Sequence, residues 1–275
     1  MSSLNGQPLT LEHGPYRAEL VTVGAALRAL SRDGVELVDS FDLDQLRPFY
    51  RGAVIAPWPN RILDGTYTFR GETYELPLTE RARGHALHGL ATWHDFAIVS
   101  VTSDRALLTT TIPAQDGYPF TINLKVSFAL NDEGLTTTVT ATNVGVGIAP
   151  YGVAAHPYIV CGTPRIDPLT LSIPADAVLE VDAERLMPRE LVDVGVHDSG
   201  ALDFRQPRVV GQQFIDHAYT ALRLETDGSC EVSLTNTEGA QTYVRWDGGV
   251  LRWVQIHTAD RPEPHRDRPA SPSSP

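Results

Sequence analysis

Three short stretches of this chain place arginine or histidine beside proline or glycine. "APWPNRI" presents Arg61 directly after a segment that two prolines stiffen, and "RGHALHGL" holds His88 next to a glycine. "YGVAAHPYI" ends an apolar run at His156, just before a proline. A planar guanidinium suits hydroxyl or anionic oxygens, and histidine exchanges protons near neutral pH. These residue types together suit the binding of a polar small molecule followed by acid–base chemistry.

Arg61 and His156 each also have a purely structural interpretation. Arg61 can belong to a surface ion pair, since such pairs are common and weak. His156 can be a hydrogen-bonded core histidine. For His88, the small neighbouring glycine favours a pocket wall where a ligand approaches the backbone closely. The residues alone leave these alternatives open.

The histidine-rich stretch "RARGHALHGLATWHDF" also raises the possibility of a metal site. His85 and His88 have the HxxH spacing, and His94 follows nearby. A strand or loop does not bring residues at this spacing together as a helix does, and the stretch contains neither cysteine nor an HExxH motif. We therefore predict no metal site. Nucleophile-elbow, dinucleotide and phosphate-loop motifs are also missing, and the carboxylates are too scattered to nominate a glycosidase pair.

Charge and cysteine content narrow the class of protein. The 275 residues carry a formal net charge of -12, and Lys125 is the only lysine, so nucleic acid and anionic membranes are poor candidate partners. Two cysteines are too few for a secreted disulfide scaffold. The N-terminus has no signal-peptide pattern, and no apolar stretch approaches the roughly 20 residues of a membrane span. We expect a soluble cytoplasmic protein.

Alternation with a period of two dominates the chain and predicts antiparallel strands. Turn signals at Arg70-Gly71 and "NDEG" predict hairpins, and Asp227-Gly228 and Asp247-Gly249 repeat the pattern. No long amphipathic helix is evident, and 22 glycines and 20 prolines fit many turns. We predict an all-β antiparallel sandwich or barrel, with one domain over residues 1–261 and a disordered or aberrant tail over 262–275.

The ordered set of these stretches resembles the aldose 1-epimerase (galactose mutarotase-like) family, in particular its bacterial branch. The resemblance covers about residues 10–260 and implies a large antiparallel β-sandwich. It also implies interconversion of the α and β anomers of a free aldose such as glucose or galactose, with no cofactor or metal. The expected partner is this monosaccharide, and the expected assembly is a monomer or weak dimer. The matching stretches are "APWPNRILDGTYTFRGETYELPLTE", "RGHALHGL", "GYPF", "YGVAAHPYI", "ALDFRQPR", "IDHAYTAL" and "WVQIHT".

The resemblance also implies roles for four residues. His156 would be the general acid, and His88 would hydrogen-bond the sugar near its ring oxygen and O1. Arg61 would bind a sugar hydroxyl, and Asp216, in "IDHAYTAL", would accept hydrogen bonds from other ring hydroxyls. Stacking of Trp58 or Tyr158 on a sugar face is a further idea.

The general base of the family has no counterpart here and is left unknown. The family places a glutamate in a Gly-Leu-Ala-Val-Glu-Pro-Met-like segment after the strand that reads "WVQIHT", followed by two more strands. This chain reads "PASPSSP" there, and Glu263 comes too early to match. GC-rich codons can be chosen for this tail such that a one-base shift encodes that segment, so a frame change is a hypothesis compatible with the sequence, and resequencing the gene tests it. We therefore expect a sandwich without its last strands. For the function, the alternative to an isomerase is a non-catalytic carbohydrate-binding protein of the same fold.

Overall fold

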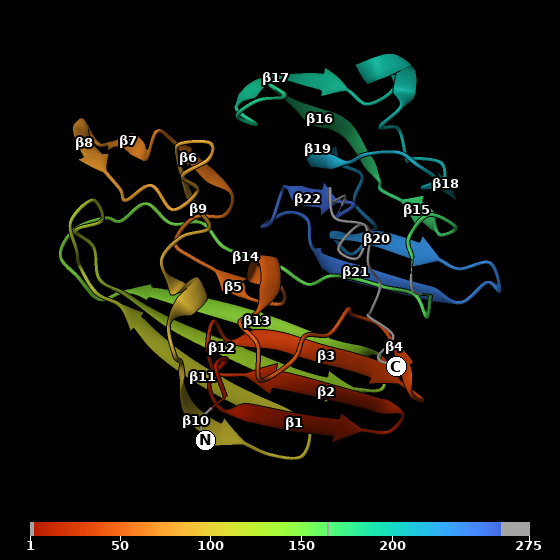
Figure 1. Cartoon of the computed structure of the whole chain (residues 1–275), viewed down its shortest axis with the longest axis horizontal. Coiled ribbons are helices and arrows are strands. Elements are labelled where there is room, and N and C mark those ends of the chain that lie inside the picture. Colours follow the sequence, from red (N-terminus) through yellow and green to blue (C-terminus); the bar gives the residue numbers. More distant parts are fainter. Residues whose placement is uncertain (1–2, 164, 260–275) are drawn as a thin grey trace. The chain divides into compact units, whose positions relative to one another are not determined.

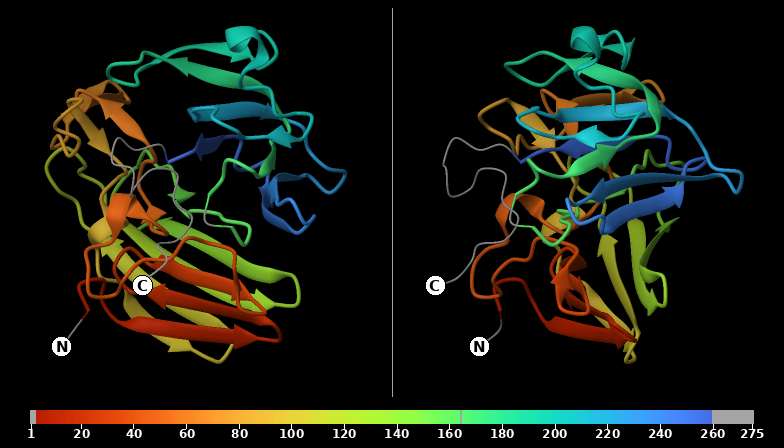
Figure 2. Two further views of the ribbon diagram at one scale, coloured as in Figure 1. Left: turned by 45° about the vertical axis from the view of Figure 1, so that its right-hand side comes forward. Right: turned by 90° about the vertical axis from the view of Figure 1, so that its right-hand side faces the viewer.

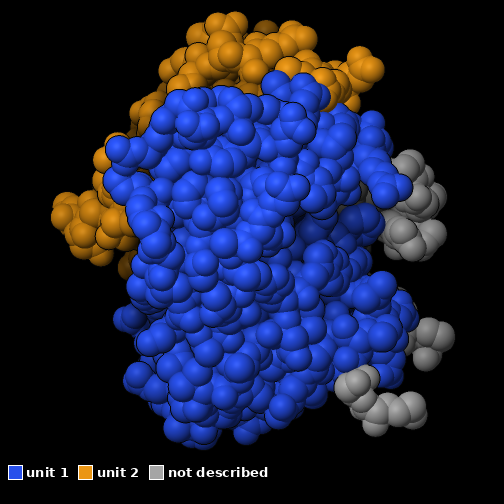
Figure 3. All heavy atoms as spheres, turned by 90° about the vertical axis from the view of Figure 1, so that its left-hand side faces the viewer, with its two compact units in different colours: residues 1–158 blue, residues 159–275 orange. Residues whose placement is uncertain are grey.

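The computed structural model describes residues 3–163 and 165–259 and divides the chain into two compact units (Figures 1 and 3). Unit 1 is Met1–Tyr158 and unit 2 is Ile159–Pro275, and each is described by itself below. The described residues form β-strands and three short 3-10 helices, with no α-helix among them. No helix in these residues is long and apolar enough to cross a membrane.

Unit 1 is built on two four-stranded antiparallel sheets that share one hydrophobic core (Figures 1 and 2). In β12, every second residue from Ile122 to Leu130 is buried, which is the pattern of a strand with one face in a core. The first sheet contains β1 (Pro8–His13), β2 (Tyr16–Val21), β3 (Ala26–Arg32) and β4 (Val35–Glu36). The second contains β10 (Ala97–Val101), β11 (Arg105–Ile112), β12 (Ile122–Asn131) and β13 (Gly134–Asn143).

Three pairs of short antiparallel strands complete unit 1, and the candidate site residues lie at their ends. Arg61 begins β6, His88 follows β9 and His156 follows β14. The pairs are β5 (Val54–Ile55) with β14 (Ala154–Ala155), β6 (Arg61–Leu63) with β9 (His85–Leu87), and β7 (Thr66–Phe69) with β8 (Glu72–Glu75). The 3-10 helices of unit 1 are η1 (Pro48–Tyr50) and η2 (Ala91–Trp93).

Unit 2 has a second pair of four-stranded antiparallel sheets, and buried side chains from both form its core. The 3-10 helix η3 (His197–Gly200) follows β17. One sheet runs β18 (Arg208–Val209), β15 (Thr170–Ser172), β20 (Ser229–Thr235) and β21 (Gln241–Asp247). The other runs β17 (Pro188–Asp193), β16 (Ala175–Val181), β19 (Asp216–Leu222) and β22 (Val254–His257).

The all-β antiparallel prediction is confirmed, as are the hairpins at Arg70-Gly71 and "NDEG", which are β7–β8 and β12–β13. The two hairpins predicted at Asp227-Gly228 and Asp247-Gly249 are wrong. The first turn joins β19 to β20 and the second joins β21 to β22, and in each case the two strands lie in different sheets. Aspartate and glycine mark a chain reversal, but they do not say which sheet receives the next strand. The hairpin formed here is β20–β21.

The sequence predicted one domain over residues 1–261. The structure divides the chain into two compact units by contact density, which does not test whether the two units fold as one domain, so the expectation stays a prediction. The tail predicted over residues 262–275, and with it the expected segment of the general base, lies outside the described residues.

Candidate functional site

Backbone hydrogen bonds between short strand pairs position the two histidines. The N–H of His88 donates to the carbonyl of Asn60 at 3.0 Å, directly beyond the β6–β9 ladder. The N–H of His156 donates to Ala53 at 3.0 Å, and the N–H of Gly52 donates to the carbonyl of His156 at 2.7 Å. Each histidine is therefore fixed to a neighbouring strand rather than carried on an unsupported loop.

Gly89 allows the segment after His88 to approach the segment after β5. Its φ is +69°, and a Cβ there would lie 2.2 Å from the carbonyl oxygen of Ala56. The same oxygen accepts hydrogen bonds from the N–H groups of Leu90 and Ala91, at 2.8 and 2.9 Å. The sequence suggested that the glycine beside His88 lets a ligand approach the backbone. In the structure, the carbonyl group of Ala56 occupies the space beside Gly89.

The rings of His88 and His156 meet edge to face in a half-buried aromatic cluster. Their centroids are 5.2 Å apart, with an interplanar angle of 83°. Tyr50 contacts His88 edge-on at 4.8 Å, and Tyr158 stacks on His156 at 5.6 Å with an angle of 27°. Aromatic pairs at these separations prefer edge-to-face and offset-stacked arrangements. The two histidines predicted from separate motifs are thus brought together.

His88 is held as a neutral ring with a defined tautomer. The N–H of Asn60 donates to Nδ1 of His88 at 3.2 Å, so Nδ1 is the acceptor and the proton lies on Nε2. Burial, followed by the charges of His156 and Arg61, lowers the pKa of His88 to about 3. Near neutral pH the ring therefore offers a neutral Nε2–H donor, which is suited to a hydroxyl or ether oxygen of a ligand.

The low pKa of His88 predicts that acid destabilises the folded protein. The unfolded residue titrates near 6.5 and the folded one near 3, so between these values the unfolded chain binds about one more proton at this residue. The stability that the neutral ring contributes is complete above pH 6.5 and is lost as the pH falls toward 3. Urea unfolding over this range should show a shallower pH dependence for His88→Gln than for the wild type, and equal slopes would contradict the assignment.

Arg61 forms a bidentate ion pair with Glu80, which uses part of its guanidinium. Its Nε and Nη2 donate to the two carboxylate oxygens at 2.8 and 3.1 Å, and its Nη1 donates to Oδ1 of Asn60 at 3.0 Å. Arg83 donates to the same carboxylate at 2.9 Å. Burial raises the pKa of Glu80, but the hydrogen bonds and charges of Arg61 and Arg83 together lower it by more. The pKa therefore lies below its ordinary value. Arg61 thus forms an ion pair, but a mostly buried, bidentate one rather than the weak surface pair considered from the sequence, and two of its five N–H groups remain for a ligand.

Replacing Glu80 with glutamine is expected to weaken ligand binding through Arg61. The two parallel hydrogen bonds that fix the guanidinium form a bidentate, charge-assisted pair, whose loss costs about 1.5–3 kcal/mol, so sugar affinity should fall by roughly tenfold or more. Titration calorimetry with a monosaccharide measures this change. The matched control is Arg83→Gln, which removes the other partner of Glu80 but leaves the Arg61–Glu80 pair in place. Unchanged affinity in Glu80→Gln would show that this pair does not serve binding.

Asp216 belongs to unit 2, where it opens β19 opposite His257 of β22. Its Oδ1 accepts a hydrogen bond from Nε2 of Gln255 at 2.8 Å, and its Oδ2 lies 3.9 Å from Nε2 of His257. Its side chain is 14% exposed, so the carboxylate is mostly buried. Both neighbours come from "WVQIHT", a stretch in which the sequence predicted no site residue.

The remaining candidates have structural partners. His85 is buried, and its Nδ1 accepts the N–H of Asp64 at 3.4 Å, while His94 is half-buried at the end of η2. Within residues 3–163 and 165–259, no group of three or more His, Cys, Asp or Glu side chains is arranged to hold a metal. The indole N–H of Trp58 donates to the carbonyl of Ala86 at 3.3 Å, and its ring packs 6.3 Å from that of Tyr118.

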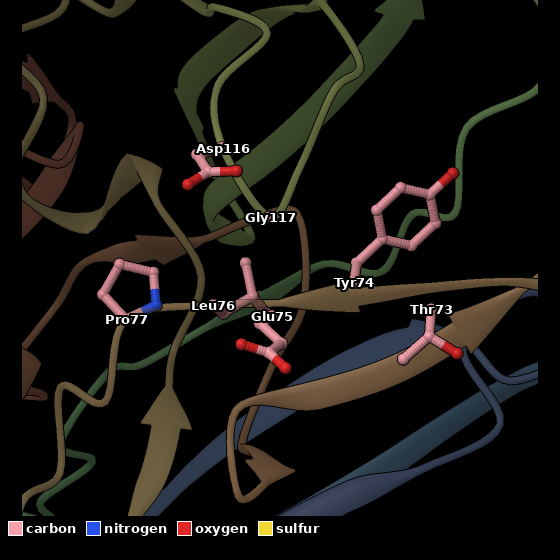
Figure 4. A pocket seen from close by; sticks show the side chains of 7 residues that line it. All are labelled: Thr73, Tyr74, Glu75, Leu76, Pro77, Asp116 and Gly117. Atoms are coloured by element: carbon pink, nitrogen blue, oxygen red, sulfur yellow. The ribbon is translucent and has the colours of Figure 1, made fainter.

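A surface pocket of about 410 Å³ in unit 1 lies over β8 and the loop before Tyr118 (Figure 4). It does not include Arg61, His88 or His156, so it is distinct from the histidine cluster. The residues that line it are Thr73, Tyr74, Glu75, Leu76, Pro77, Asp116 and Gly117.

Comparison with known proteins decides the family. The model of the family described as aldose 1-epimerase matches residues 7–260, which is nearly the whole chain. The chain belongs to the aldose 1-epimerase family. One relative that aligns over nearly the whole chain is the uncharacterized protein YihR of Escherichia coli K12. It is 33% identical over 258 residues, which cover 94% of this chain and 80% of YihR.

Solved structures show the same fold. A GalM/aldose epimerase homologue from C. elegans has a TM-score of 0.73 at 20% identity, covering 85% of this chain and 76% of its own. Galactose 1-epimerase from Lactobacillus acidophilus NCFM has a TM-score of 0.70 at 23% identity, covering 83% and 72%. The predicted galactose mutarotase-like all-β fold is thus confirmed, and the chain is an isomerase of this family by descent.

Proposed function

We propose that the chain interconverts the α and β anomers of a free aldose. The observation that carries the proposal is the His88–His156 pair, in which a neutral Nε2–H donor lies beside a second, half-buried histidine. Membership of the aldose 1-epimerase family supports the reaction type. The solved galactose 1-epimerase with this fold supports a monosaccharide as the class of substrate.

The reaction needs a proton donor at the ring oxygen and an acceptor at the anomeric hydroxyl. His156 protonates the ring oxygen while a base removes the O1 proton, and the C1–O5 bond breaks as the C1 carbonyl forms. The C1–C2 bond then rotates, and the reverse steps close the ring on the other face. His88 hydrogen-bonds the ring oxygen or O1 through Nε2–H, while Arg61 binds another hydroxyl. Groups with suitable pKa values typically contribute about 10²–10⁴-fold each.

The general base is left unassigned. Two carboxylates lie next to the aromatic cluster in unit 1, and each is paired with arginine: Glu80 with Arg61 and Arg83, and Asp39 with Arg51. Pairing favours the ionised form but lowers basicity, so neither suits this role. This observation favours a second candidate function, a carbohydrate-binding protein that holds the sugar without turning it over.

Polarimetry on freshly dissolved α-glucose and α-galactose, combined with titration calorimetry, separates the two functions. An isomerase speeds the approach to anomeric equilibrium in proportion to its concentration. A binder shows saturable heat of binding while the optical rotation relaxes at the rate of buffer. Neither acceleration nor binding with any aldose tested would contradict both.

The proposal includes the setting in which the protein acts. The substrate is a free aldose, the reaction uses no cofactor, and the chain works as a monomer or weak dimer. The cysteine content, too low for a secreted disulfide scaffold, favours a cytoplasmic location.

A further inference from the structure

A buried ion pair lies behind the histidine cluster in unit 1. Nη1 of Arg51 is 2.6 Å from Oδ2 of Asp39 and donates to the carbonyl of Ser40 at 2.8 Å. The side chains of Arg51 and Asp39 are 9% and 0% exposed. Taking two charges out of water is costly, and a well-packed apolar pair is often at least as stable. Fold stability alone is therefore a weak reason for this pair.

The ion pair is connected to His156 through Tyr158. Cζ of Arg51 lies 4.6 Å from the centroid of the Tyr158 ring, within the range of a cation–π contact. The N–H of Asp39 donates to the carbonyl of Tyr158 at 2.7 Å, so the pair holds both the ring and the backbone of this residue. Tyr158 in turn stacks on His156.

The backbone beside Arg51 reaches His156 directly. The N–H of Gly52 donates to the carbonyl of His156 at 2.7 Å. Gly52 has a φ of +72°, and a Cβ there would lie 2.0 Å from the carbonyl oxygen of Leu27, so this turn is confined by its surroundings. The position of Arg51 is therefore coupled to that of His156 through two separate routes.

We propose that Arg51 and Asp39 are positioning residues for His156 and act through the ring of Tyr158. The planar guanidinium lies over the tyrosine ring while its Nη1 is paired with Asp39, a combination that an ammonium group does not reproduce. The orientation of the His156 ring then depends on a charge pair that does not touch the sugar. This inference rests on the proposed function for its catalytic consequence, but the geometric part stands without it.

The kinetic test is a double-mutant cycle between Arg51→Lys and His156→Asn. Arg51→Lys is expected to lower kcat for anomer interconversion by about tenfold or more with little change in KM, because the sugar contacts remain. In the His156→Asn background the same substitution should have no further effect, since the residue that it positions is gone. The control is Arg208→Lys in unit 2, another arginine that lies over an aromatic ring, that of Phe204, and this variant should affect stability and leave kcat unchanged.

A second readout does not depend on turnover. Histidine ring signals in long-range ¹H–¹⁵N spectra of the full chain, without sugar, report the ring current that Tyr158 exerts on His156. Arg51→Lys should shift the His156 signals and leave those of buried His85 in place, and Tyr158→Leu gives the full size of the shift. Unmoved His156 signals in a folded Arg51→Lys protein, or equal kcat losses in both backgrounds, would overturn the proposal. A wild type without turnover would contradict the proposed function only, and the spectra would still decide the positioning role.

Discussion

Replacing His156 with asparagine is expected to slow anomer interconversion by about 10²–10⁴-fold, the usual contribution of a positioned acid. Asparagine retains hydrogen-bonding capacity but cannot transfer a proton in this pH range. The backbone at residue 156 is held by Ala53 and Gly52, and the side chain is only half-buried, so the fold should persist. The affinity for sugar should change much less than the rate, since Arg61 and His88, the proposed sugar-binding residues of unit 1, remain.

The measurement is polarimetry with the variant and the wild type at equal concentrations, with thermal unfolding to verify the fold. His94→Asn is the matched control, because His94 is another half-buried histidine of unit 1 that makes no ring contact with the cluster around His156. Its rate should equal that of the wild type. A His156→Asn rate within twofold of the wild-type rate would remove His156 from the role of acid.

Gly89→Ala is expected to destabilise the protein by about 2–5 kcal/mol. A left-handed backbone costs a non-glycine residue about 1–2 kcal/mol. The added methyl would also overlap the carbonyl oxygen of Ala56, at 2.2 Å, and relief of such overpacking adds about 1–3 kcal/mol. Since the N–H groups of Leu90 and Ala91 bind the same oxygen, any shift disturbs the support of His88.

Gly14→Ala separates the two costs. Gly14 has a φ of +53°, and a Cβ there would meet nothing within 4 Å, so this variant carries only the backbone term. Urea unfolding of both variants should show the larger loss for Gly89→Ala, which should also lower sugar affinity. If the two variants lose the same stability, the close approach at Ala56 has no energetic weight.

The strand pattern was predictable because it depends on neighbouring residues. The buried side chains of β12 alternate with exposed or half-buried ones, and the Arg70-Gly71 turn has positive φ at both residues, as a two-residue hairpin turn requires. The turns at Asp227-Gly228 and Asp247-Gly249 look the same in sequence but join different sheets. An alternating strand fits either sheet of a sandwich, so local pattern cannot choose between them.

The residue types of the site were predictable, but the contacts that tune them were not. Arg61, His88 and His156 each lie in a motif that resembles the family. The Asn60 hydrogen bond that sets the tautomer of His88 joins residues 28 positions apart, and the Arg61–Glu80 fork joins residues 19 apart. Both depend on the β6–β9 pairing and the turn before β9 rather than on any short pattern. Asp39 and Arg51 lie in no motif at all, and only their burial together identifies them.

The most direct test of the proposed reaction is two-dimensional exchange NMR on a glucose or galactose solution already at anomeric equilibrium. Cross-peaks between the α and β H1 signals report interconversion itself and are insensitive to binding without turnover. Catalysis by the His88–His156 pair predicts cross-peaks whose rate rises with the concentration of wild-type protein, and a protein-dependent rate that falls by about 10²–10⁴-fold with His156→Asn. Exchange at the buffer rate with wild-type protein, or equal exchange with both proteins, would contradict it.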